Sequence, residues 1–248
     1  MSYNKFKKLH QQDELLILGN IWDAQSAKIA QDAGFQALGS SSHAIANSMG
    51  YEDGQKIKVD EILFVVERII KAVKIPLSVD FEAGYSDKPE EVAANVKRLA
   101  DAGVVGINLE DAKPGATRKL IDPKLHVQKI QAIKASTKNI FINARTDTYV
   151  TKHENALQET INRAKMYEQA GADGLFVPVI ETKSDITSLL KETKLPLNIF
   201  LTPNIPNMKD LNKMGVKRLS HGAKIYDWIV SNYTKEFDKF LKNPKLPK

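Results

Sequence analysis

Two carboxylates that directly follow an apolar segment are the first candidates for chemistry. Asp80 and Glu82 stand in the segment VDFEAGY, which continues from residues 75–78. Residues two apart on a strand share a side, so we expect both carboxylates to point the same way. Two like charges at the end of a buried strand are costly, and a divalent cation with oxygen ligands offsets that cost. Because loop carboxylates are often simply hydrogen-bonded or solvated, the interpretation depends on further ligands elsewhere in the chain.

The composition narrows the classes of protein that the chain can belong to. The 248 residues include no cysteine, which removes disulfides, thiolate nucleophiles and thiolate metal sites, and favours a cytoplasmic enzyme. No apolar run reaches the roughly 18 residues of a membrane span, and the N-terminus lacks the apolar core of a signal peptide. The net charge of +6 comes from scattered lysines. We therefore expect a small anionic substrate rather than nucleic acid or a membrane.

Strand-like and helix-like segments alternate along the chain. Several of the strand-like segments are apolar almost without a break, as strands buried on both faces are. Eight strand–helix units in 248 residues match the size of an α/β protein of the (β/α)8 TIM barrel type. We predict one domain, residues 1–248, with a frayed tail from about 243, and a doubly wound sheet is the alternative. The predicted strands are residues 15–22, 37–42, 77–82, 105–110, 140–146, 174–180, 197–201 and 218–220.

Polar residues gather where the predicted strands end, which is where a TIM barrel places its chemistry. Four carboxylates are expected to converge there, with Arg145 opposite them. A set of oxygen ligands without histidine favours Mg²⁺ or Mn²⁺ over zinc. The fork of Arg145 suits a substrate carboxylate, and an ion pair with Glu110 or Asp147 is the structural alternative. The expected metal-binding carboxylates are Asp80, Asp53, Glu82 and Glu110.

Six short blocks of the sequence carry a pattern that extends over nearly the whole chain. They are GNIWD (19–23), SSS (40–42), GYEDG (50–54), VDFEAGY (79–85), GINLED (106–111) and NARTD (143–147). In order and spacing they resemble the isocitrate lyase/phosphoenolpyruvate mutase superfamily, over about residues 5 to 235. The resemblance implies a (β/α)8 barrel, Mg²⁺, and substrates that pass through an enolate or enolpyruvate-like state. It also implies a homodimer or homotetramer, often with the last helix exchanged between subunits.

The resemblance assigns the metal-binding roles residue by residue. Asp80 resembles the direct metal ligand of the family. Asp53, Glu82 and Glu110 resemble the carboxylates that hold the metal largely through water. Such a metal would stabilise negative charge that develops on an oxygen of a 2-oxo acid.

The resemblance also implies a substrate-binding set. Ser41, Ser42 and His43 fall where a loop of the family donates backbone N–H groups to the substrate oxyanion. Arg145 resembles the arginine that grips the substrate carboxylate, and we expect Trp22 to form an apolar wall of the pocket. The expected catalytic residues are Arg145, His43 and Glu110.

The segment after residue 110 departs from the family pattern. The lyases that cleave isocitrate or methylisocitrate carry a cysteine in a Lys-x-Cys-Gly-His loop, but residues 110–120 read EDAKPGATRKL and contain neither cysteine nor histidine. The mutases carry an asparagine in their gating loop, which is also absent here. We expect residues 111–121 to be a mobile lid whose cations (Lys113, Arg118 and Lys119) close over an anionic substrate, and a solvated basic loop is the alternative.

We expect the histidines to lie in different parts of the fold. His43 either faces the substrate pocket as an acid or base or caps a loop. His221 is expected near the mouth of the barrel, whereas His10, His126 and His153 are expected at the surface.

Together these patterns favour an Mg²⁺-dependent carbon–carbon lyase or decarboxylase that acts on a small 2-oxo or 2-hydroxy (di)carboxylic acid through an enolate. Isocitrate and methylisocitrate lyase activity are not expected, because the thiol acid is missing. One alternative is a phosphorus–carbon bond enzyme of the phosphoenolpyruvate mutase or phosphonopyruvate hydrolase type. The other is a non-catalytic barrel that binds an oxo acid.

Overall fold

A computed structural model describes residues 2–115 and 117–245 of the chain, and in these residues parallel strands form one sheet that curves into a barrel. The strands are β1 (Leu16–Ile17), β2 (Gly19–Ile21), β3 (Leu38–Ser40), β4 (Leu77–Asp80), β5 (Gly106–Glu110), β8 (Phe141–Arg145), β9 (Gly174–Val177), β10 (Leu197–Phe200) and β11 (Arg218–Ser220). Their order in the sheet is β1-β11-β10-β9-β8-β5-β4-β3-β2. The predicted (β/α)8 barrel is confirmed.

The two ends of the sheet belong to one stretch of chain, and this closes the barrel. β1 pairs with β11, whereas β2 pairs with β3. Between them, the N–H of Leu18 donates to the carbonyl of Leu219 (2.9 Å) and the N–H of Gly19 donates to that of Ala37 (3.2 Å). The single strand predicted over residues 15–22 is therefore split in two, because its halves pair with opposite edges of the sheet.

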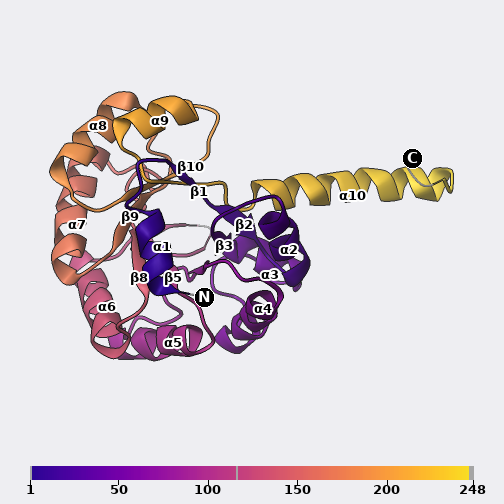
Figure 1. Ribbon diagram of the computed structural model, residues 1–248, viewed down its shortest axis with the longest axis horizontal. Coiled ribbons are helices and arrows are strands. Elements are labelled where there is room, and N and C mark those ends of the chain that lie inside the picture. The colour runs from indigo at the N-terminus through magenta and orange to yellow at the C-terminus, as the bar shows by residue number, and fades with distance from the viewer. Residues whose placement is uncertain (1, 116, 246–248) are drawn as a thin grey trace.

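Helices surround the sheet, as Figure 1 shows. Local sequence sets several of their ends: Asp23 caps a helix in a capping box, and Pro89 and Pro123 occupy first helical positions. Gly171 ends another helix in the left-handed conformation, with φ of 98°. The helices are α1 (Tyr3–Leu9), α2 (Ala24–Asp32), α3 (Ser42–Ser48), α4 (Val59–Ala72), α5 (Pro89–Asp101), α6 (Pro123–Ser136), α7 (Ala156–Ala170), α8 (Lys183–Glu192), α9 (Met208–Met214) and α10 (Lys224–Lys242).

Helix α1, which the sequence analysis did not predict, covers the amino-terminal end of the barrel. Phe6 is fully buried and contacts the ring of Phe141 edge-on, with 5.4 Å between centroids. His10 follows the helix and stacks on the same ring at 4.2 Å. The surface position predicted for His10 is wrong, and so is that of His126, which is fully buried against Tyr167.

Helix α10 leaves the barrel and extends away from it (Figure 1). None of its residues is buried, and its apolar side chains are among the most exposed of the described residues: Trp228 is 67% exposed, Phe237 73% and Leu241 86%. No helix in residues 2–115 and 117–245 is long and apolar enough to cross a bilayer. The tail predicted from residue 243 includes residues 246–248, which lie outside the described residues.

Candidate active site

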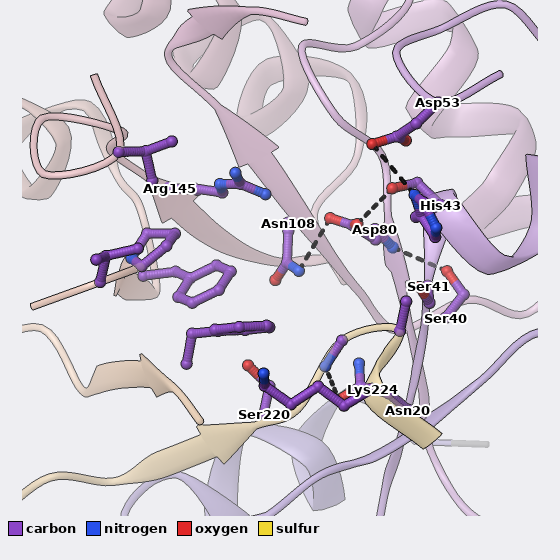
Figure 2. Close-up of a pocket in the computed structure, with 18 of the residues that line it drawn as sticks. Asn20, Ser40, Ser41, His43, Asp53, Asp80, Asn108, Arg145, Ser220 and Lys224 are labelled. Carbon is purple, nitrogen blue, oxygen red and sulfur yellow. Dashed lines mark hydrogen bonds and ion pairs between the residues drawn. The ribbon is translucent and has the colours of Figure 1, made fainter. Parts of the chain in front are cut away.

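A cavity of about 380 Å³ lies at the carboxyl ends of the strands. Every strand of the barrel sheet from β2 to β11 places a residue from its middle or its carboxyl end in the lining, as expected for a TIM-barrel active site. Figure 2 shows Asn108 between Asp80 on one side and Arg145 on the other. These strand residues are Asn20, Ser40, Asp80, Asn108, Arg145, Phe176, Phe200 and Ser220.

Asp80 is held in the cavity wall by its neighbours. The hydroxyl of Ser42 donates to its Oδ2 (2.7 Å), and Nδ2 of Asn108 donates to its Oδ1 (3.2 Å). The N–H of Asp80 donates to Oγ of Ser40 at 2.9 Å. Asp80 is therefore a carboxylate with a fixed orientation that faces open space, as a metal ligand needs to be (Figure 2).

Glu82 does not share the orientation of Asp80, which corrects the expectation from the sequence. β4 ends at Asp80, and Glu82 has a left-handed backbone with φ of 46°. Its side chain is buried behind the cavity, where Oε2 accepts from the hydroxyl of Tyr85 (2.5 Å) and Oε1 accepts from the N–H of Gln55 (3.1 Å). The rule that residues two apart point the same way fails because the strand does not continue.

The turn after β4 is strained and is held in place by its surroundings. Glu82 and Tyr85 in this turn have positive φ, at 46° and 62°, and so has Gln55 (61°), whose N–H donates to Glu82 from another loop. The buried ammonium of Lys129 donates to the carbonyl of Ala83 at 2.8 Å. Strained backbone that several contacts hold in one form is common where a site must be rigid.

Burial and, to a smaller extent, the charges of Glu110, Asp80 and Asp53 raise the pKa of Glu82 to about 8 against the opposing hydrogen bond from Tyr85. An unfolded glutamate titrates near its ordinary value of 4.5. Between these values the folded protein binds more protons than the unfolded chain, so the free energy of unfolding falls as pH rises. The shift reflects mainly the burial of Glu82 away from water, to which the neighbouring carboxylates add.

Replacing Glu82 with glutamine is expected to flatten that fall in stability between pH 4.5 and 8, because glutamine does not titrate. Thermal unfolding of the metal-free protein across this range measures the effect, with Glu52→Gln, an exposed glutamate, as the control. A slope identical to that of the wild type would contradict the assignment.

Glu110 and Arg145 belong to a buried ion-pair cluster. Arg145 donates from Nε and Nη2 to the two oxygens of Asp147 (2.6 and 3.0 Å), and its Nη1 lies 3.1 Å from Oε2 of Glu110. Arg118, from the predicted lid, donates to the same oxygen of Glu110 at 3.0 Å and to Asp147 at 2.5 Å. Burial opposes the charge of Arg145, but the two carboxylates outweigh it and raise the pKa of Arg145. The ion pair that was the structural alternative for Arg145 is thus present, although Arg145 also lines the cavity.

The carboxylates fit a hydrated metal better than a fully protein-bound one. In the described part of the chain, no three His, Asp or Glu side chains are placed to ligate one ion together. Asp80 and Asp53 line the cavity, whereas Glu82 and Glu110 do not. Oε1 of Glu110 is buried without a hydrogen-bond partner there. Mg²⁺ usually keeps several waters and takes one or two carboxylates, which is the donor set present here.

The serine segment is the start of a helix rather than a loop. Ser41 caps α3, its Oγ accepting from the N–H of Ala44 (3.3 Å), and Ser42 and His43 are the first residues of that helix. Ser41, Ser42 and His43 all line the cavity. The ring of His43 lies between two carboxylates, 3.7 Å from Asp53 and 3.6 Å from Asp227 of α10.

Trp22 does not line the cavity but packs edge-on against Tyr226 of α10, with 5.2 Å between ring centroids. The apolar wall that is present instead was not predicted, because Phe176 and Phe200 stand in strands where apolar residues indicate core. Val179 of this wall has φ of 63°, an unusual conformation for a β-branched residue. The wall consists of Val150, Phe176, Pro178, Val179 and Phe200.

His221 lies near the mouth as predicted, but its ring is engaged, since Nε2 accepts from the N–H of Asn20 at 3.2 Å. Lys224, at the start of α10, also lines the cavity and was not predicted. Figure 2 shows its side chain on the side of the cavity opposite Asp80 and Arg145.

The predicted lid, residues 111–121, begins and ends in a short antiparallel pair of strands, β6 (Ala112–Lys113) and β7 (Lys119–Leu120); Ala116 lies outside the described residues. Arg163 of α7 holds both ends, donating to Oδ2 of Asp111 (2.9 Å) and to the carbonyl of Ile121 (3.1 Å). Of its three cations, Arg118 reaches the site, Lys113 lies 3.5 Å from the exposed Asp87, and Lys119 is exposed.

The lid lies against the loop that carries Asp53. A Cβ added to Gly54 would be 3.1 Å from the backbone nitrogen of Gly115. Gly54→Ala is therefore expected to push the lid away, increase hydrogen exchange in residues 112–120 and weaken ligand binding. Gly50→Ala is a matched control, because Gly50 also has positive φ (81° against 99°) but has open space where its Cβ would be. Equal exchange in the two variants would show that backbone strain, and not the lid contact, is responsible.

The profile of the family described as phosphoenolpyruvate phosphomutase matches residues 6–241. The chain belongs to this family. It therefore lies in the isocitrate lyase/phosphoenolpyruvate mutase superfamily of lyases and mutases, as its sequence blocks predicted.

Several relatives show the range of this family. An uncharacterized protein of Mycobacterium tuberculosis is 36% identical over 89% of this chain and 83% of its own length. An oxaloacetate decarboxylase of Bradyrhizobium is 30% identical over 81% of this chain and 70% of its own. A crystal structure from Burkholderia cenocepacia, of a protein proposed to be a phosphonomutase, has a TM-score of 0.90 and 35% identity over 96% of this chain and 99% of its own.

Proposed function

We propose that this protein is an Mg²⁺-dependent carbon–carbon lyase or decarboxylase that acts on a small 2-oxo or 2-hydroxy (di)carboxylic acid. The observation that carries the proposal is Asp80, which hydrogen bonds from Ser42 and Asn108 hold in the cavity wall. The oxaloacetate decarboxylase among the relatives supports this class of substrate.

Each group of residues has a role in this proposal. Asp80 would hold Mg²⁺, with Asp53, which also lines the cavity, assisting through water; Glu82 and Glu110, expected from the sequence to assist, lie behind the cavity and would act on the site through their charge. When bound, Mg²⁺ supplies positive charge that stabilises negative charge on the substrate oxygens. Arg145 would bind the substrate carboxylate from the opposite wall.

The proposed reaction releases the electron pair of the broken carbon–carbon bond and transfers one proton, and the site must accommodate both. In the lyase reaction a base removes the proton of the substrate hydroxyl, the carbon–carbon bond breaks, and its electron pair forms the enolate of the departing acid. In decarboxylation the same pair is left behind when the carboxylate departs as carbon dioxide. The start of α3 and Arg145 would stabilise the enolate, and water, His43 or a lid residue would return the proton.

A phosphorus–carbon bond enzyme is the second candidate, favoured by the structure from Burkholderia cenocepacia and by the family profile. Release of inorganic phosphate from phosphonopyruvate would support this candidate. Release of carbon dioxide from oxaloacetate, or cleavage of a substituted malate, would support the first.

Binding of oxalate, a planar mimic of the enolate of pyruvate, tests the site before any substrate is known. We expect calorimetry to detect oxalate binding with Mg²⁺ and none in its absence. Binding without turnover of any 2-oxo acid would indicate a non-catalytic barrel. No binding in either condition would contradict the proposed function.

We also infer that a second copy of this chain covers helix α10, giving a homodimer or homotetramer. Exposed apolar patches of this kind mark interaction surfaces. Trp228→Glu with Phe237→Glu is expected to give monomers in sedimentation experiments, whereas Lys235→Glu on the same helix is not. A wild-type monomer would contradict the inference. The apolar residues concerned are Ile225, Trp228, Val230, Tyr233, Phe237, Phe240 and Leu241.

A further inference from the structure

Arg218 of β11 is a buried cation without a counter-ion. It is 1% exposed inside the barrel, and in the described residues no carboxylate lies within 4.0 Å of its guanidinium. Its Nη2 donates to Oδ1 of Asn108 at 3.2 Å, whereas Nε and Nη1 have no partner there. A buried charge without a partner is costly, and an apolar side chain is the usual filling of a TIM-barrel interior. Packing alone therefore does not explain why an arginine occupies position 218.

The reason lies in the contacts of Asn108. Its Oδ1 accepts from Arg218 and also from Nδ2 of Asn143 at 2.9 Å, and its own Nδ2 donates to Oδ1 of Asp80. A guanidinium has donors and no acceptor, so the amide oxygen of Asn108 must face Arg218. The amide N–H group is thereby left facing Asp80. Arg218 thus supports, together with Asn143, the orientation in which the N–H end of the amide meets Asp80.

We propose that Arg218 is a positioning residue that acts through Asn108 to hold Asp80 in the orientation that binds the metal. This proposal rests on the proposed function, in which Asp80 is the metal ligand. Partners behind a ligand commonly change metal affinity by about 10- to 100-fold when they are replaced.

The charge of Arg218 also suits this place. Burial lowers the pKa of Arg218 to about 9, and the charge of Asp80 opposes that change. Because this value stays above neutrality, Arg218 remains charged at pH 7. Its charge complements that of Asp80.

Metal affinity tests the proposal with variants that leave the charge of the barrel interior unchanged. A lysine at position 218 keeps the charge, but its ammonium stops short of the Nη2 position. Asn108→Leu removes the amide. We expect Arg218→Lys and Asn108→Leu each to weaken Mg²⁺ binding by about 10-fold or more. The double variant should be no weaker than Asn108→Leu alone, since the effect of Arg218 passes through Asn108.

Asn198→Leu is the control for disturbing the same interior, because Asn198 is fully buried beside Arg218 in the sheet but bonds to Ser220 rather than to Asn108. It should bind Mg²⁺ like the wild type. Unchanged affinity in Arg218→Lys, or additive losses in the double variant, would overturn the proposal.

A metal-free measurement separates this proposal from the proposed function. In the wild type, Asp80→Asn should shift the side-chain amide signals of Asn108 in an NMR spectrum. In the Arg218→Lys background the same substitution should shift them less, because the amide oxygen has lost one of its two donors and the amide is held less firmly toward position 80. Equal shifts in both backgrounds would overturn the role of Arg218, whether or not the wild type binds Mg²⁺. Failure of the wild type to bind Mg²⁺ would by itself contradict the proposed function. Arg218→Gln offers a second background should the lysine variant not fold.

Discussion

Asp80→Asn is expected to weaken Mg²⁺ binding by about 100-fold or more and to remove Mg²⁺-dependent binding of oxalate. Asparagine has the shape of aspartate but no charge, and its amide group would meet donors on both sides. Those donors are the hydroxyl of Ser42 and Nδ2 of Asn108. The effect should exceed that of any other single carboxylate, because Asp80 is the one that lines the cavity with both oxygens oriented.

The same substitution should change the stability of the metal-free protein much less than its metal affinity, because relief of the repulsion from Glu82 offsets the lost hydrogen bonds from Ser42 and Asn108. Asp80 raises the pKa of the buried Glu82, so removing its charge relieves repulsion. Asp60→Asn is the control, since Asp60 is exposed and pairs with Arg98 on the protein surface. Calorimetry and thermal unfolding separate the two effects. Wild-type affinity in a folded Asp80→Asn variant would exclude Asp80 as the ligand.

The barrel could be predicted because its elements are specified locally. The sequence from Pro123 to Ser136 predicts a helix with a proline at its first position, and the structure places α6 at these bounds with Asp122 as its cap. Helix α1 could not be predicted in the same way. It has one buried residue, Phe6, which is buried because the end of the barrel is open to receive it. That condition belongs to the assembled barrel and not to the local sequence.

The candidate site, like the fold, could be predicted only in part from the sequence. The sequence blocks placed Asp80, Ser42 and Arg145 at strand ends, and the structure places all three in one cavity. They did not show that the chain turns after Asp80 and moves Glu82 behind the cavity. Strained backbone of this kind depends on contacts from distant parts of the chain, such as Lys129 of α6.

Arg218 illustrates a signal that was present but could not be interpreted from sequence. An arginine at the start of a three-residue strand is equally compatible with a surface position, and its depth depends on the register with β10. Once that register is known, Arg218 lies inside the barrel and below the candidate ligand. The polar interior then becomes part of the site, because the contacts of Asn108 join it to Asp80.

Arg145→Met is expected to lower the free energy of unfolding by about 3–5 kcal/mol, because it leaves buried carboxylates with one cation fewer. Asp147 is fully buried and Glu110 is 1% exposed, and Arg118 would be their remaining cationic partner in the cluster. For a chain of this size the melting temperature should fall by roughly 6–20 °C. Arg98→Met is the matched control: Arg98 pairs with an exposed carboxylate, so its loss should cost less than about 1 kcal/mol.

Arg145→Lys separates the two roles of this arginine. Lysine keeps the positive charge beside Asp147 and Glu110 but cannot reproduce the fork. We expect much of the stability to return while oxalate binding in the presence of Mg²⁺ stays at least about 10-fold weaker. If Arg145→Lys restores both stability and oxalate affinity, then any cation suffices and the fork does not recognise the carboxylate. Arg145→Met could instead lose stability but bind oxalate normally at a temperature where it is folded. In that case Arg145 only holds the buried cluster together, and another cation of the cavity must bind the substrate carboxylate. The candidates are Arg118 and Lys224.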